Sequence, residues 1–110
     1  PMTMIYELRQ WLWAHGYAIE RETLCREDRR HYVILSVRGG AKECLYPREK
    51  CAVSPALIAA PDAGVYLRRL IEREIRALNG MERSENTDIA RLRSQQALVR
   101  ELTAAWEGLK

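Results

Sequence analysis

Apolar residues recur every three or four positions between residues 4 and 15, which is the spacing of an amphipathic helix. The expected buried stripe consists of Ile5, Leu8, Trp11, Leu12 and His15. The side expected to face solvent consists of Glu7, Arg9 and Gln10. We expect Thr3 to cap the N-terminus of this helix and Gly16 to end it in the left-handed conformation.

Residues 17–24 and 32–37 then alternate between outward and inward positions, which is the pattern of strands. The polar residues 27–30 separate them, so the two segments are predicted to form an antiparallel hairpin. In the first strand, Tyr17, Ile19 and Arg21 are expected on one side, opposite Ala18, Glu20 and Glu22. A hairpin with one helix is a poor independent unit, so Ile34, Leu35 and Val37 are expected to need a further covering layer.

Residues 41–61 read as a connector interrupted by Pro47, Pro55 and Pro61, within which the apolar residues 56–60 are expected to dock as a short turn. A second helix is predicted from Asp62, its expected N-cap, to residue 78, where Asn79-Gly80 should stop it. Its apolar positions are Leu67, Leu70, Ile71, Ile75 and Leu78. Residues 80–87 are expected to form a loop.

A third helix is predicted from about residue 87 to residue 107, with Asp88 in its first turn. Its expected seam consists of Ile89, Leu92, Val99, Leu102, Trp106 and Leu109, with Gln95 or Gln96 in the missing position. The two long helices should pack as an antiparallel coiled-coil hairpin. The fold class is therefore α+β, with a sheet edge in residues 1–40, a connector in residues 41–61 and a helical hairpin in residues 62–110.

Composition narrows the class of protein. The chain has 110 residues, is 47% hydrophobic and 30% charged, and carries a net charge of +3. No apolar run approaches the roughly 20 residues that span a bilayer. Cys25, Cys44 and Cys51 form no C-x-x-C pair, which favours reduced thiols in the cytosol and argues against a disulfide framework or a metal site.

Motifs for catalysis are lacking in this sequence. It contains no glycine-rich phosphate loop and no arrangement of Ser, His and acid that marks a nucleophile. His15 is expected to interact with the C-terminus of the first helix, and His31 to be a surface residue. The acidic residues around the hairpin turn are expected to be solvated.

Arginines supply the candidate binding site. Arg69, Arg73 and Arg76 fall on one side of the second helix, expected opposite its apolar stripe, and the further candidates are Arg68, Arg91 and Arg93. Such residues contact nucleic-acid phosphates. The alternative interpretation is a solvated surface balanced by nearby glutamates.

Several segments in order resemble one family. They are Leu8-Arg9-x-Trp11-Leu12, Gly16-Tyr17-x-Ile19, Glu22-x-Leu24, Glu27-Asp28 and Tyr32-x-Ile34, followed by Pro55-Ala56-Leu57-Ile58 and Tyr66-Leu67. The chain is similar to the bacterial SAM-dependent tRNA (adenine-N1)-methyltransferases that modify an adenine of the D-arm region. Ser54 stands where the family has a glycine before proline.

The resemblance implies that this chain corresponds to the C-terminal part of a Rossmann-like enzyme. The SAM-binding half would precede Pro1, the last residue of the family's catalytic motif, which implies a place for Pro1 at the rim of the target-base pocket. The resemblance further implies SAM as cofactor of the intact enzyme and tRNA as substrate. We expect the 110 residues alone to bind no cofactor, to be inactive, and to self-associate through the open sheet edge.

Two alternatives belong to other classes. One is a stand-alone interaction or dimerisation module that uses the helical hairpin and the exposed sheet. The other is a small RNA-binding protein without catalysis, whose affinity would fall steeply with salt.

Overall fold

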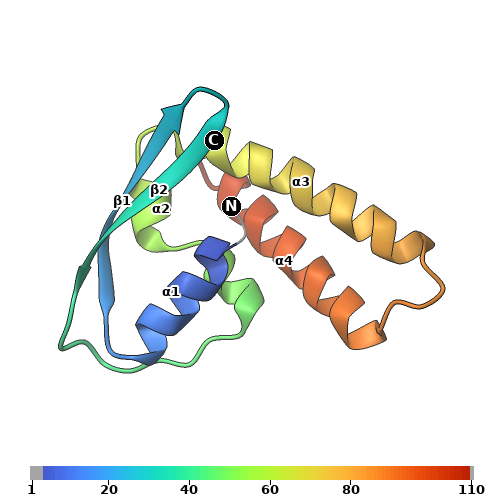
Figure 1. The fold of residues 1–110 in the computed structure, drawn as a ribbon, viewed down its shortest axis with the longest axis horizontal. Coiled ribbons are helices and arrows are strands. Elements are labelled where there is room, and N and C mark those ends of the chain that lie inside the picture. The colour runs from blue at the N-terminus through green and yellow to red at the C-terminus, as the bar shows by residue number, and fades with distance from the viewer. Residues whose placement is uncertain (1–3, 110) are drawn as a thin grey trace.

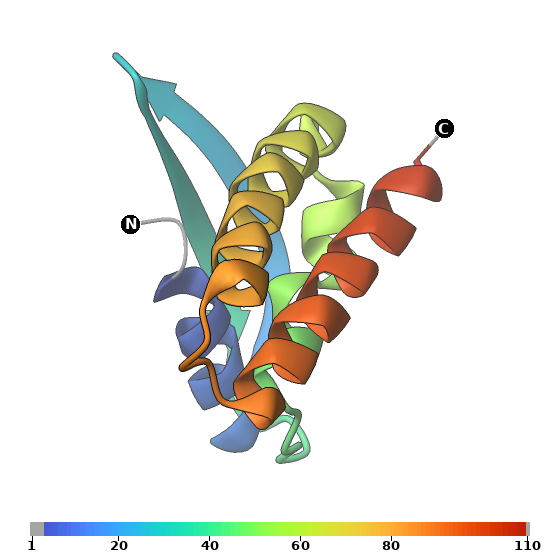
Figure 2. The same cartoon turned by 90° about the vertical axis from the view of Figure 1, so that its right-hand side faces the viewer.

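The computed structural model describes residues 4–109 and confirms the α+β class (Figure 1). The elements are α1 (Met4–Ala14), β1 (Ala18–Glu27), β2 (Arg30–Arg38), the 3-10 helix η1 (Arg48–Ala52), α2 (Pro55–Ala59), α3 (Ala63–Arg83) and α4 (Ile89–Glu107). The expected cap Thr3 lies outside the described residues. Both strands lie along one flank of the molecule, and α3 and α4 lie beside each other (Figure 2).

Gly16 ends α1 as expected. Its φ of +79° is left-handed, and the Tyr17 amide donates to the Leu12 carbonyl at 2.9 Å, which closes the last turn. The Ala41 amide in turn donates to the Gly16 carbonyl at 2.8 Å. A Cβ added at residue 16 would lie 2.9 Å from the Ala41 oxygen, so only glycine fits where the connector crosses this turn.

The hairpin is antiparallel, and it contains a bulge that the alternation did not predict. Ile19 pairs with Val37, but the next pair is Arg21 with Ser36, so Glu20 is an extra residue in β1. A bulge of one residue exchanges the two faces of the strand beyond it. The expectation that Ile19 and Arg21 share a side was therefore wrong: Arg21 is exposed and Glu22 is buried.

The same face of the sheet carries Glu22, Leu24, Val33 and Leu35, and it packs on the core. On the opposite face Ile34 remains 56% exposed, and Tyr32 is also exposed. The hairpin is thus covered on one face. Ile34 and Val37 remain exposed within residues 4–109, as expected, but the expectation was wrong for Leu35, which packs on the core.

One hydrophobic core joins all the helical elements. Its buried members are Ile5, Tyr6, Ala52, Leu57, Tyr66, Leu67, Leu70, Leu98 and Leu102. The apolar segment expected to dock does so as α2, where Leu57 is fully buried. Residues from α1, the connector, α3 and α4 therefore stabilise one another.

α1 packs differently from its predicted stripe. Leu8 and Trp11 are 46% and 51% exposed, and His15 is exposed too, so their expected burial was wrong. Ile5 and Leu12 are buried as expected. The buried side instead includes Tyr6 and Arg9. Relative to the prediction, the helix is rotated about its axis, so that the polar residue Arg9 shares the buried side with apolar residues.

α3 and α4 run antiparallel (Figure 1), but their ends differ from the prediction. Asn79-Gly80 does not stop α3, which continues to Arg83, because a helical glycine costs only about 1 kcal/mol relative to alanine. Asp62 precedes α3 in the left-handed conformation, and its side chain makes no capping bond. Asp88 is the N-cap of α4 and accepts from the Ala90 amide at 3.0 Å.

The seam between the long helices is partly as predicted. Gln95 occupies the expected gap, where its Nε2 donates to the Glu74 carbonyl at 3.0 Å, and Leu102 is fully buried. Leu98 is buried in the seam, although the sequence analysis did not assign it there. Ile89 was assigned to the seam but is exposed.

We expect Leu67→Ala to lower the free energy of unfolding by about 2–5 kcal/mol, because Leu67 is fully buried and its truncation leaves a cavity. Val65→Ala, on an exposed position of the same helix, is the matched control and should change stability by less than about 0.5 kcal/mol. Urea denaturation followed by circular dichroism measures both. Equal losses would contradict the assigned core.

Candidate nucleic-acid interface

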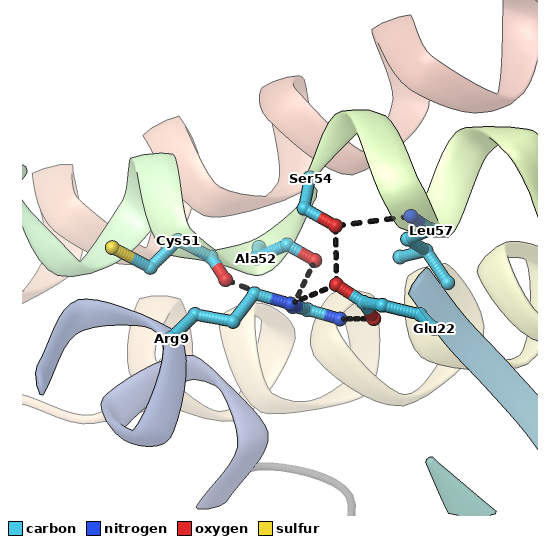
Figure 3. Close-up of polar contacts among 6 residues, drawn as sticks. All are labelled: Arg9, Glu22, Cys51, Ala52, Ser54 and Leu57. Atoms are coloured by element: carbon cyan, nitrogen blue, oxygen red, sulfur yellow. Dashed lines mark hydrogen bonds and ion pairs between the residues drawn. The ribbon is translucent and has the colours of Figure 1, made fainter. Parts of the chain in front are cut away.

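A buried ion pair holds the elements that carry the candidate interface (Figure 3). Arg9 was expected to face solvent, and this was wrong: its side chain is fully buried. Arg9 Nε donates to Glu22 Oε2 at 3.0 Å, and Nη2 donates to Oε1 at 2.7 Å. This is the bidentate geometry in which guanidinium and carboxylate groups interact most strongly.

The remaining polar atoms of this pair also have partners. Arg9 Nη1 donates to the carbonyls of Cys51 at 2.9 Å and Ala52 at 3.0 Å, which ties α1 to η1. The Ser54 hydroxyl donates to Glu22 Oε2 and accepts from the Leu57 amide at 3.0 Å, which caps α2. Since a buried charge is tolerated only when it is paired and hydrogen-bonded, this satisfaction explains why both charges can be interior.

A signal for Arg9 was present in the sequence, although charge argued against it. Position 9 follows Ile5 by four residues and precedes Leu12 by three, which places all three on one side of a helix. Glu22 was one of the acidic residues expected to be solvated around the hairpin turn, and this was wrong, because the bulge turns it inward.

Three of the candidate arginines, Arg69, Arg73 and Arg91, line surface cavities. Arg69 lines a cavity of about 260 Å³ that also contains Arg26 and His31. Arg73 and Arg91 line a second cavity of about 560 Å³, between α3 and α4, together with Arg48. α3 contributes to both cavities one helical turn apart.

The other candidates line neither cavity. Arg68, Arg76 and Arg93 are exposed, and Arg68 is ion-paired with Glu72 at 3.5 Å. The second and third arginines of the predicted stripe, Arg73 and Arg76, also differ in burial. Arg73 is half-buried, so the stripe borders the packed side of α3 rather than lying opposite it.

Arg26 and Arg48 are the residues that sequence analysis missed. Arg48 is fixed by an ion pair from its Nε to Glu7 Oε1 at 2.7 Å, and its guanidinium lies 5.1 Å from the centroid of the Tyr6 ring. Arg26 is the cross-strand partner of His31. The contacts of Arg48 are not local in sequence, so no spacing could indicate them. The pairing of Arg26 with His31 follows from the predicted hairpin, but the approach of Arg69 to this pair does not.

Burial and neighbouring charge shift several titratable groups in this region. Burial raises the pKa of Tyr6, and the nearby Glu74 carboxylate adds to the effect. Burial also raises the pKa of Tyr66. For His31, burial lowers the pKa, and Arg69 and Arg26 lower it further, so the imidazole is neutral at pH 7.

His15 interacts with the end of α1 as expected. Its Nδ1 donates to the Trp11 carbonyl at 2.7 Å, and its ring stacks on Trp11 with centroids 4.1 Å apart. Within residues 4–109, the three cysteines are free and no cluster of three His, Cys, Asp or Glu side chains could hold a metal ion. Nor does that part of the chain contain a helix long and apolar enough to cross a membrane.

Comparison with known proteins identifies the family. The family model of TrmK, the tRNA (adenine(22)-N(1))-methyltransferase, matches residues 1–104. The chain belongs to the TrmK family. No curated protein and no solved structure matches it. The match confirms the resemblance seen in the sequence and relates the chain to tRNA methylation.

TrmK-family methyltransferases use SAM, and a SAM site would require residues that fit this cofactor. A class I cofactor loop requires glycines at a strand-to-helix turn that let the backbone approach the ligand. Gly16 follows a helix, and a Cβ there would meet the chain's own Ala41 carbonyl. Gly40 follows β2 but leads into the connector. These glycines do not fit a SAM cradle, and Pro1, the candidate for the base pocket, lies outside the described residues.

We expect Arg9→Met to destabilise this TrmK-family chain by about 3–5 kcal/mol, because it leaves the Glu22 carboxylate buried without its counter-charge. Arg38→Met is the control: the Arg38–Glu20 pair spans 3.4 Å at the surface, and its loss should cost no more than about 1 kcal/mol.

Denaturation midpoints of Arg9→Met, Glu22→Gln and the double variant give the coupling between the two side chains. If the two single effects simply add, the pair does not act as a unit and its central structural role is refuted.

Proposed function

We propose that these residues form the tRNA-binding part of a cytoplasmic, SAM-dependent enzyme that methylates N1 of a tRNA adenine. The family match supports the reaction class. SAM, when bound, supplies the methyl group. Because Gly16 and Gly40 do not fit a SAM cradle, we infer that the cofactor is held by residues outside these 110 and that the chain alone is inactive.

The arginines of α3 and α4 carry the proposed contact with tRNA. Arg68, Arg69, Arg73, Arg76, Arg91 and Arg93 would contact phosphates, and the cavities lined by Arg69, Arg73 and Arg91 give these three the central part. Folded RNA is recognised largely through its shape and backbone, so a rigid pair of helices is a suitable platform. The observation that carries the proposal is that Arg69, Arg73 and Arg91 line solvent-accessible cavities.

Each of the three segments of the chain has its own part in this proposal. Residues 1–40 would be the edge of the catalytic sheet, with Pro1 at the rim of the target-base pocket, and residues 62–110 the tRNA-holding hairpin. Residues 41–61 connect them and supply the Arg9 contacts at Cys51 and Ala52. The buried pair would thereby fix the orientation of the hairpin relative to the catalytic sheet.

Exposed apolar side chains on the hairpin and on α1 favour a second role, the binding of a protein surface. Ile34 on β2 and Met4, Leu8 and Trp11 on α1 are large, apolar and exposed. In the enzyme, the SAM-binding half would cover these residues. In its absence, a second copy of the chain would do so, which is the dimerisation role considered for a stand-alone module.

The tRNA role is tested by replacing Arg69, Arg73 and Arg76 with glutamate. We expect the affinity of the chain for an unmodified tRNA transcript, measured by fluorescence anisotropy, to fall at least about tenfold and to lose much of its salt dependence. Reversal of Arg21, Arg38 and Lys42 changes the net charge equally outside the two cavities and is the matched control. Equal loss in both triple variants would indicate non-specific attraction and count against the assigned surface.

Activity is tested in the same samples with labelled SAM. No methyl transfer is expected from the 110 residues with or without the substitutions. Methylation by the chain alone would overturn the proposal that the cofactor site lies elsewhere.

Self-association is expected to rise with concentration in light scattering, because the open apolar surface is exposed to water. Ile34→Glu should reduce it, since a charge would be placed on the open face, whereas Val65→Glu on exposed α3 should not. A wild-type chain that stays monomeric at high concentration would argue against this surface as a docking site.

A further inference from the structure

A small cavity lies where the tip of the hairpin meets the first turns of α3. Its volume is about 260 Å³. The titratable residues that line it are Cys25, Arg26, His31 and Tyr32 from the hairpin, and Tyr66 and Arg69 from α3, with Asp62 at the start of α3. Leu24 and Val65 complete the lining.

The charges in this cavity favour an anion. Arg26 and Arg69 contribute two positive charges from different elements, against the single carboxylate of Asp62. Burial lowers the pKa of His31, and Arg69 and Arg26 lie near enough to lower it further. The His31 Nε2 atom is buried and has no hydrogen-bond partner in the structure.

The start of α3 borders the cavity. Asp62 makes no side-chain capping bond there, and its carboxylate offsets part of the positive charge of the two arginines. α3 is 21 residues long, and its residues Val65, Tyr66 and Arg69 face the cavity. Two guanidinium groups and an imidazole nitrogen without a hydrogen-bond partner together match the oxygens of a phosphate.

We propose that this cavity binds a phosphate group, and that in the complex with tRNA its occupant is a phosphate of the RNA backbone. The second part rests on the proposed function and deepens it, since it assigns a phosphate contact to the hairpin residue Arg26 as well as to α3. Arg26 from the hairpin and Arg69 from α3 donate to the phosphate, and His31, which lines the same cavity, is the third donor once it takes up a proton.

Inorganic phosphate tests the site directly. The ring signals of the two histidines, followed by NMR as a function of pH, give the pKa of His31 with and without phosphate, and His15 at the far end of α1 is an internal control. A bound anion favours the imidazolium, so the pKa of His31 is expected to rise by up to about one unit while that of His15 stays constant.

Arg69→Ala sharpens this experiment. Removing a positive charge should raise the pKa of His31 in the absence of phosphate and abolish the response to added phosphate. No response in the wild-type chain, or an equal response of both histidines as from general screening, would overturn the phosphate site. Arg69 is exposed, and circular dichroism verifies that the variant folds.

The assignment to an RNA phosphate is tested with Arg26→Ala, and Arg21→Ala on the same strand is the control. Both side chains are exposed, but only Arg26 lines the cavity. In anisotropy titrations, Arg26→Ala is expected to reduce affinity several-fold and to lower the salt slope by about one, and Arg21→Ala to do neither.

The outcomes separate this inference from the proposed function. If the triple glutamate variant of α3 loses tRNA but Arg26→Ala does not, the proposed function stands and the RNA phosphate assignment is refuted. If phosphate shifts His31 but the wild-type chain does not bind tRNA, the anion site is supported and the proposed tRNA role fails.

Discussion

The bidentate pair between Arg9 and Glu22 is the constraint on which the rest of this structure depends. Each side chain belongs to a different element, and each completes its hydrogen bonds on the connector, at Cys51, Ala52 and Ser54. A partly satisfied pair in this position would cost several kcal/mol, so the connector cannot move away while α1 and β1 keep their places. The polar cluster therefore specifies one arrangement, where apolar packing alone would tolerate several.

The geometry of the interface follows from this arrangement. Fixing η1 places Arg48 over Tyr6 and beside the helical pair, and capping α2 with Ser54 directs the chain into α3. The first turns of α3 then lie against the hairpin tip, where Arg69 joins Arg26 and His31. Residues far apart in sequence thus form basic cavities because one buried charge pair sets the course of the connector between them.

Most elements of the fold could be predicted because they depend on local chemistry. The period of the apolar residues gave the helices and the hairpin, and Gly16 ended α1 because only glycine adopts its conformation without strain. Arg9 could not be placed, because a charged residue is normally exposed and its partner Glu22 turns inward only through the bulge at Glu20. Gly80 led to the wrong prediction that α3 ends there. The packing of two long helices stabilises α3 by more than the small local cost of one glycine.

The candidate site likewise contains residues that the sequence could predict and residues that it could not. Arg69, Arg73 and Arg91 could be named from their helices, but their neighbours Arg26 and Arg48 could not, because tertiary contacts alone bring them together. The exclusion of Arg68 and Arg76 from the cavities likewise required the rotation of α3 about its axis, which depends on Tyr66, Leu67 and Leu70 in the core.

α1 links the basic cavities to the open apolar surface. Its buried side holds Arg9 over the connector, while Met4 and Leu8 on its exposed side border His31 and Tyr66 beside the cavity lined by Arg26 and Arg69. A helix that is apolar on more than one side is typical of a buried helix. A protein surface that covered Met4 and Leu8 would also exclude water from the neighbourhood of His31, Arg26 and Arg69. Because lower local dielectric strengthens the attraction between guanidinium and phosphate, docking at the apolar surface and anion binding in the cavity would reinforce each other.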